Sequence, residues 1–63
     1  MQYAEIDIIW DGGRAREVLE FRHGVGRLAM EEYVKELARK CGWKDVRLSV
    51  GRDWTGWLFG SKK

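Results

Sequence analysis

Four tryptophans must be accommodated in a chain of only 63 residues, and this ratio limits what the chain can fold into. They are Trp10, Trp43, Trp54 and Trp57. A domain of this length has too small an interior to enclose four indole rings. At least one large aromatic face is therefore expected at the surface. Exposed tryptophan beside arginine is typical of binding surfaces.

Composition indicates one ordered domain spanning residues 1–63, because 44% of the chain is hydrophobic and proline is absent. The single cysteine, Cys41, excludes an internal disulfide, and one histidine, His23, gives no metal-ligand spacing. We therefore expect no cofactor, no metal and a cytoplasmic, reducing setting. The longest apolar run has three residues, so neither a membrane span nor a signal-peptide core is expected.

The net charge of +2 is distributed unevenly. Residues 1–13 carry three acids and no base, whereas residues 46–63 carry four bases and only Asp53 as an acid. This asymmetry is far weaker than that of a dedicated duplex-DNA binder. It permits nucleic acid as a partner without requiring it.

Two alternating segments around Asp11-Gly12 predict a β-hairpin over residues 3–22. A two-residue turn pairs Ile8 with Ala15 and also places Ala4 beside Leu19. The same register sets Asp7 opposite Arg16 on the outer face. A three-residue turn would pair apolar with charged residues on the two faces of the hairpin. A four-residue turn would keep apolar residues paired with apolar ones and remains an alternative.

Residues 27–41 predict an amphipathic helix. Gly42 suits the left-handed position after the helix, and Trp43 can pack back on Ala38. The sequence offers no strong cap at the helix start, where Gly24-Val25-Gly26 forms a loop. The apolar face, expected in the core, consists of Met30, Tyr33, Val34, Leu37, Ala38 and Cys41.

A second hairpin is expected over residues 45–59, followed by a frayed tail at 60–63. A three-residue turn would pair Val50 with Trp54 and leave Trp57 and Phe59 outside. A four-residue turn would pair Leu48 with Trp57 and leave Trp54 outside; it buries more apolar area and is preferred. Either register leaves one tryptophan outside the core.

The element order ββαββ predicts an α+β fold, with a four-stranded mixed sheet in the order 2-1-4-3 and one helix on one face. The first and fourth strands would be parallel neighbours at the centre of the sheet. This element order resembles the β-grasp arrangement of the immunoglobulin-binding domains of protein G. Element order alone carries no function.

No constellation of residues indicates catalysis, and we expect a non-enzymatic protein. His23 and Cys41 lie at opposite ends of the helix, roughly 20 Å apart. Glu5 and Asp7 share a strand face without a second half-site for a metal. The segment Gly24-Val25-Gly26-Arg27 lacks the remaining residues of either phosphate-loop fingerprint.

The leading functional hypothesis is a protein-binding module of the inhibitor or adaptor type, docking on a larger protein. Its short, compact and motif-free chain suggests a phage- or mobile-element-encoded inhibitor of host machinery, such as an anti-CRISPR protein. The edge strands 14–22 and 45–50 could also pair with a partner strand or form a homodimer. The alternative is single-stranded nucleic-acid binding on the helix-free face, with bases stacked on aromatic rings. The candidate contact residues are Trp54, Trp57, Arg47, Arg52, Tyr3, Arg14, Arg16 and Arg22.

Overall fold

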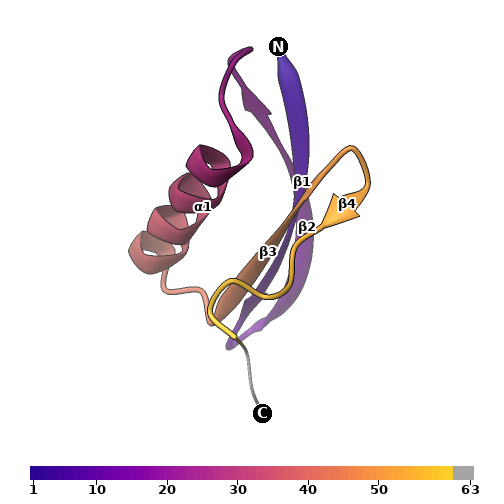
Figure 1. Ribbon diagram of the computed structural model, residues 1–63. Helices are drawn as coiled ribbons and strands as arrows, with labels where there is room; N and C mark the ends of the chain where they lie inside the picture. The colour runs from indigo at the N-terminus through magenta and orange to yellow at the C-terminus, as the bar shows by residue number, and fades with distance from the viewer. Residues whose placement is uncertain (61–63) are drawn as a thin grey trace.

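A computed structural model describes residues 1–60 and shows one helix packed on one face of a four-stranded sheet (Figure 1). The predicted tail at 60–63 lies outside the described residues except for Gly60. The α+β class expected from the sequence is confirmed. The elements are β1 (Gln2–Trp10), β2 (Gly13–Phe21), α1 (Arg27–Cys41), β3 (Asp45–Val50) and β4 (Asp53–Trp54).

The first hairpin has the two-residue turn that its alternating pattern predicts. Ile8 pairs with Ala15, and Asp7 pairs with Arg16. The four-residue alternative is therefore wrong. Because paired residues share a face, this register directs Ile6 and Ile8 toward the helix and Asp7 toward the opposite, open face.

Helix α1 has the bounds that its apolar periodicity predicts. No side chain caps its start at Gly26, whereas Gly42 adopts the left-handed conformation with φ 74°. The Trp43 N–H donates to the Ala38 carbonyl at 2.9 Å, which closes the last turn. Arg27 ties the first turn to the end of the sheet, since its Nη1 and Nη2 donate to Oδ2 and the carbonyl of Asp53, each at 2.7 Å.

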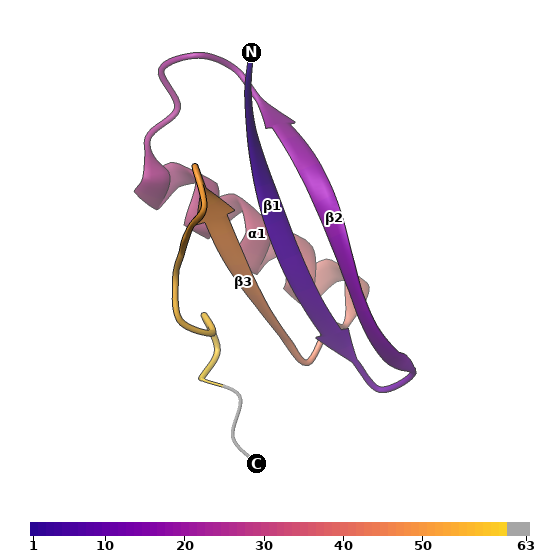
Figure 2. The ribbon, with the colours of Figure 1, turned by 90° about the vertical axis from the view of Figure 1, so that its right-hand side faces the viewer.

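The strand order is β2-β1-β3-β4 and every pairing is antiparallel, so the predicted order 2-1-4-3 with parallel central strands is wrong. β3, not the last strand, lies beside β1 (Figure 2). This placement sets Ile8 beside Val46 and buries both side chains. The resemblance to the β-grasp arrangement is not confirmed. β2 is an edge strand as expected, but β3 is internal.

The second hairpin has neither predicted register. Its turn has two residues, Gly51 and Arg52, and it pairs Ser49 with Trp54. Both turn residues have positive φ, 59° and 70°, which suits the right-handed twist of the flanking strands. β4 ends at Trp54, and the chain beyond it follows β3 without forming a regular strand (Figure 2).

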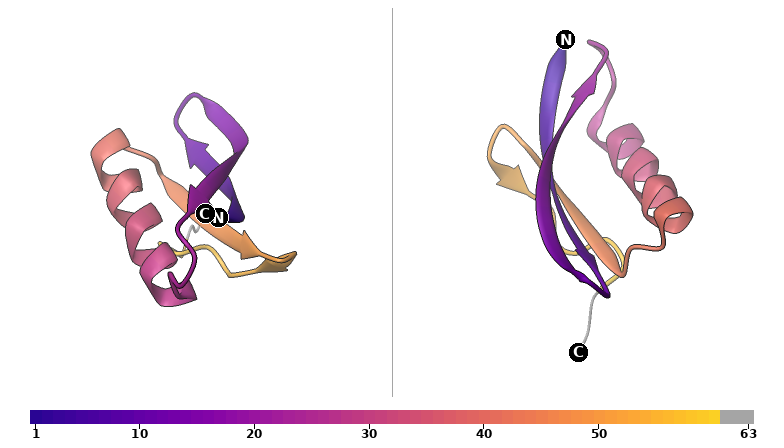
Figure 3. Two further views of the ribbon diagram at one scale, coloured as in Figure 1. Left: turned by 90° about the horizontal axis from the view of Figure 1, so that it is seen from above. Right: turned by 180° about the vertical axis from the view of Figure 1, so that it is seen from behind.

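The core lies between α1 and the central strands β1 and β3. The helix is on one side of the sheet in both views of Figure 3. Of the side chains expected in this core, Tyr33 is 53% exposed, and Cys41 is exposed as well. The Cys41 side chain lines a solvent-accessible groove at the end of the helix, beside Trp10 and Trp43. The buried apolar side chains are Ala4, Ile6, Ile8, Met30, Val34, Ala38, Val46 and Leu48.

Candidate functional site: the Arg–Trp face

A buried carboxylate lies at the centre of the open face of the sheet. Asp7 on β1 pairs with Arg16 of β2 on one side and with Arg47 of β3 on the other. No helix covers this face (Figures 1 and 3), yet the Asp7 side chain is only 3% exposed. Side chains from the neighbouring strands must therefore cover it.

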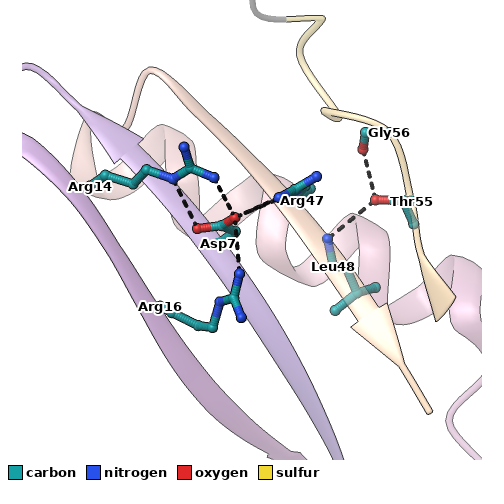
Figure 4. Close-up of polar contacts among 7 residues, drawn as sticks. All are labelled: Asp7, Arg14, Arg16, Arg47, Leu48, Thr55 and Gly56. Atoms are coloured by element: carbon teal, nitrogen blue, oxygen red, sulfur yellow. Dashed lines mark hydrogen bonds and ion pairs between the residues drawn. The ribbon is translucent and has the colours of Figure 1, made fainter. Parts of the chain in front are cut away.

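Three guanidinium groups surround Asp7 (Figure 4). Arg14 donates from Nε to Oδ1 at 3.3 Å and from Nη2 to Oδ2 at 2.9 Å. Arg47 donates from Nε and Nη2 to Oδ2 at 3.1 and 2.9 Å. Arg16 forms an ion pair with Oδ2 at 3.7 Å. One carboxylate thus holds three arginines that come from two strands.

The same arginines lie over two indole rings. Arg47 is 4.9 Å from the ring centroid of Trp54 and 4.7 Å from that of Trp57. Arg16 lies 5.0 Å from Trp54, and Arg14 lies 5.5 Å from Trp57. The contacts therefore alternate in the order Arg16, Trp54, Arg47, Trp57, Arg14. All four distances are within the range of cation–π attraction. We call these five residues together with Asp7 the Arg–Trp face.

An irregular backbone brings both indoles to one face. In a regular strand Trp54 and Trp57, three residues apart, would point to opposite faces. Here the regular strand stops at Trp54. The Thr55 N–H donates to the Leu48 carbonyl at 2.8 Å. The Leu48 N–H donates to the Thr55 hydroxyl at 3.2 Å, as Figure 4 shows. The Leu48 N–H is thus bonded to a side-chain oxygen and not to the backbone carbonyl that a paired strand would supply. The chain can therefore leave the regular strand direction before Gly56.

Asp45 holds the rest of this irregular segment. Its carboxylate accepts hydrogen bonds from the N–H groups of Val46 at 2.8 Å and Phe59 at 2.9 Å, and the side chain is fully buried. The Leu58 N–H also donates to the Val46 carbonyl at 2.9 Å. These bonds fix residues 55–59 along β3 and so hold Trp57 at Arg47.

Hydrogen bonding to Arg14 is the largest influence on the Asp7 carboxyl and holds its pKa at about 2, below the usual 3.8. Burial acts in the opposite direction, and the hydrogen bond from Arg47 and the charges of both arginines lower the pKa further. Asp7 is therefore ionised at neutral pH. The cluster of one carboxylate and three guanidinium groups carries a formal charge of +2.

Much of this positive charge is accessible to solvent. The side chains of Arg14 and Arg16 are 56% and 55% exposed, whereas Arg47 lies deeper. Nη1 of Arg14 is not used in the hydrogen bonds to Asp7, and Arg16 contacts Asp7 only at ion-pair distance. The face thus presents fixed cationic donors beside two indole rings.

The structure brings together five of the eight predicted contact residues. Tyr3 and Arg52 line a separate hollow of about 300 Å³ on the same sheet face, and the Tyr3 hydroxyl donates to Glu20 at 3.2 Å. Arg22 directly follows β2, and its carbonyl accepts a hydrogen bond from the Gln2 side-chain amide. Sequence reasoning found the pair of Asp7 and Arg16 but missed Asp7 as the common partner of all three arginines.

The other residues considered for chemistry stay apart. His23 contacts the terminal amine of Met1 at 2.6 Å, and Cys41 is a free thiol at the far end of α1. Among residues 1–60, no group of three His, Cys, Asp or Glu side chains could hold a metal ion. Within the same residues, α1 is too short and too polar to cross a membrane, and no other helix occurs.

Comparison of the chain with protein-family models, with curated proteins and with solved structures finds no match.

Proposed function

We propose that the chain is a non-enzymatic protein-binding module that docks through its Arg–Trp face on an acidic patch of a larger protein. The observation that carries this proposal is that Asp7 and two indoles hold three guanidinium groups in place, while Arg14 and Arg16 remain more than half exposed. Arginine and tryptophan dominate the binding energy at protein interfaces. An acidic partner would complement the formal charge of +2 on this face.

Preorganisation favours this use of the face. A free arginine or tryptophan side chain loses conformational entropy when a partner immobilises it. Here the hydrogen bonds to Asp7 and the ring contacts already restrict these side chains. Binding would therefore require little further ordering. Such a module could act as an inhibitor or adaptor by occupying a partner's surface, and anti-CRISPR proteins are one class of this kind.

The alternative of single-stranded nucleic-acid binding is less well supported. Base stacking requires an open ring face, but each of Trp54 and Trp57 already has two guanidinium groups within 5.5 Å. Asp7 also neutralises part of the positive charge. Tyr3, at 60% exposure, is the remaining stacking platform on this side of the sheet.

The test compares wild-type protein with the double variant Arg14→Gln/Arg16→Gln. The matched control is Lys40→Gln/Lys44→Gln, which removes the same charge from exposed positions outside the Arg–Trp face. Circular dichroism verifies that all three proteins are folded. A partner is captured on immobilised wild-type protein, identified and purified, and its affinity for each protein is then measured by calorimetry.

We expect at least tenfold weaker binding of that partner by the arginine variant and unchanged binding by the lysine control. Equal binding by all three proteins would refute the proposal. Fluorescence anisotropy with labelled single-stranded oligonucleotides, at low and physiological salt, tests the alternative. Micromolar oligonucleotide binding that weakens steeply with salt would favour nucleic acid as the partner.

A further inference from the structure

A second surface feature lies on the helix side of the sheet, away from the Arg–Trp face. It is a groove of about 510 Å³ between the tip of the first hairpin and the end of α1. This volume is within the range of small-ligand sites. The lining of the groove includes Ile8, Trp10, Asp11, Glu17 and Trp43.

Two indole rings form walls of this groove. Trp10 comes from the end of β1 and is 38% exposed, and Trp43 follows the helix and is partly buried against the core. The Trp10 ring lies against the turn: a Cβ atom added to Gly12 would come 2.6 Å from its Nε1. Gly12 thus permits the close approach that keeps the indole at the groove.

The charged side chains of the groove are both acidic. Asp11 and Glu17 are exposed, and within residues 1–60 neither carboxylate forms an ion pair. Glu17 pairs with Ile6 across the hairpin and therefore lies on the apolar, helix-facing side of the sheet. The lining contains no basic residue. Its formal charge is −2, opposite in sign to that of the Arg–Trp face.

We propose that this groove binds a small organic cation, namely an alkylammonium ion with an aliphatic stem. The faces of Trp10 and Trp43 would attract the ammonium group through their ring quadrupoles. The carboxylates of Asp11 and Glu17 would complement its charge. The stem would cover the apolar floor at Ile8, a side chain that is itself part of the core. This inference is independent of the function proposed for the Arg–Trp face.

The test uses butyltrimethylammonium as the probe and 3,3-dimethyl-1-butanol, a water-soluble neutral isostere of its trimethylammonium end, as the control ligand at matched concentration. The readout is the set of indole N–H resonances in ¹H–¹⁵N NMR spectra of the full chain. We expect the cation to shift the resonances of Trp10 and Trp43, with saturation at millimolar concentration, and to leave those of Trp54 and Trp57 in place. Equal shifts with the neutral isostere, shifts confined to Trp54 and Trp57, or no saturable shift would overturn the proposal.

The affinities of three variants for the cation test which side chains bind it. Glu17→Gln changes an exposed side chain, so the fold should persist, and we expect at least threefold weaker binding of the cation. Trp43→Leu keeps an apolar wall but removes the ring, and we expect at least tenfold weaker binding. Trp57→Leu, on the opposite face, is the control and should bind as wild type does. Unchanged affinity in Glu17→Gln would refute the proposal even if Trp43→Leu failed to fold.

A further titration distinguishes a free alkylammonium ion from an ammonium group carried by a polypeptide. A short peptide carrying trimethyllysine presents the same group on a polypeptide. If this peptide shifted the groove resonances and butyltrimethylammonium did not, the small-cation proposal would be wrong, and the groove would be a peptide site.

Discussion

Arg47 and Asp7 are 40 residues apart in the chain, yet Nε and Nη2 of Arg47 donate to the same carboxylate oxygen of Asp7, at 3.1 and 2.9 Å. This contact joins β3 to the first hairpin on the face that no helix covers. Because Trp54 and Trp57 also contact Arg47, the end of the chain is linked to the same point. The Arg–Trp face therefore contributes both to the fold and to the surface proposed for binding.

Removal of the Asp7 charge should destabilise the fold. Asp7→Asn leaves three neighbouring guanidinium groups without their carboxylate, and we expect the free energy of unfolding at pH 7 to fall by about 3 kcal/mol. Urea denaturation measures this loss. The control is Asp11→Asn, which changes an exposed acid at the hairpin turn and should cost less than about 0.5 kcal/mol. Equal losses in the two variants would contradict the central role of Asp7.

The lowered pKa of Asp7 predicts an acid-sensitive contribution to stability. Since the folded-state pKa is about 2 and the ordinary value is 3.8, the unfolded chain binds the proton more readily between these values. The contribution, about 2 kcal/mol, is fully present above about pH 4 and is lost as the pH falls toward 2. Denaturation of wild type and Asp7→Asn at several pH values should show this loss in wild type alone. Parallel pH profiles would count against it.

Arg47 and Trp57 should be energetically coupled. A double-mutant cycle with Arg47→Gln and Trp57→Leu is expected to give a coupling free energy of about 0.5 to 1 kcal/mol, because the guanidinium lies over the indole. The matched cycle pairs Arg47→Gln with Trp43→Leu on the other side of the sheet and should be additive. A coupling equal to that of the control cycle would mean that the ring contact adds nothing to stability.

The Thr55 hydroxyl should be required for the irregular segment. Thr55→Val keeps the shape of the side chain but removes the acceptor for the Leu48 N–H, so we expect a loss of about 1 to 2 kcal/mol in the free energy of unfolding. Thr55→Ser retains the hydroxyl and should lose less than half as much. Thermal and urea denaturation both report the difference. A loss in Thr55→Ser as large as that in Thr55→Val would show that the methyl group contributes as much as the hydroxyl, which would contradict the prediction.

The turn between β3 and β4 carries strain at Arg52, whose φ is 70° without the freedom of glycine. Arg52→Gly should raise the free energy of unfolding by about 0.5 kcal/mol, because Gly suits the second position of this turn type. Gly51→Ala, at φ 59°, should lower it by about 1 kcal/mol. Urea denaturation compares the two variants, and a loss of stability in Arg52→Gly would argue against the strained turn.

The first hairpin and the helix could be predicted from the sequence because their signals are local. Alternation on both sides of Asp11-Gly12 permits few registers, and the apolar period of residues 27–41 ends at a glycine suited to a left-handed cap. In each case the residues that decide the structure are near neighbours in the chain.

The strand order and the centre of the candidate site depend on contacts between distant residues. Local patterns do not show that β3 lies beside β1, since that depends on how Val46 and Leu48 pack beneath the helix. The prediction that one tryptophan lies inside and one outside assumed a regular strand over residues 54–59. Gly56 was the available signal that alternation fails there, because glycine in a strand often marks an irregularity.

The strand pairings also limit how copies of this chain could assemble. β3 is paired on both sides, and the hydrogen bonds from Thr55 and Leu58 occupy its outer edge beyond the two residues of β4. Among the described residues, β2 is therefore the one long strand with a free edge. A growing ribbon of molecules needs two free edges on every subunit. Pairing through β2 would use the one long free edge that residues 1–60 of each copy present, so an assembly built on long-strand pairing would stop at two copies.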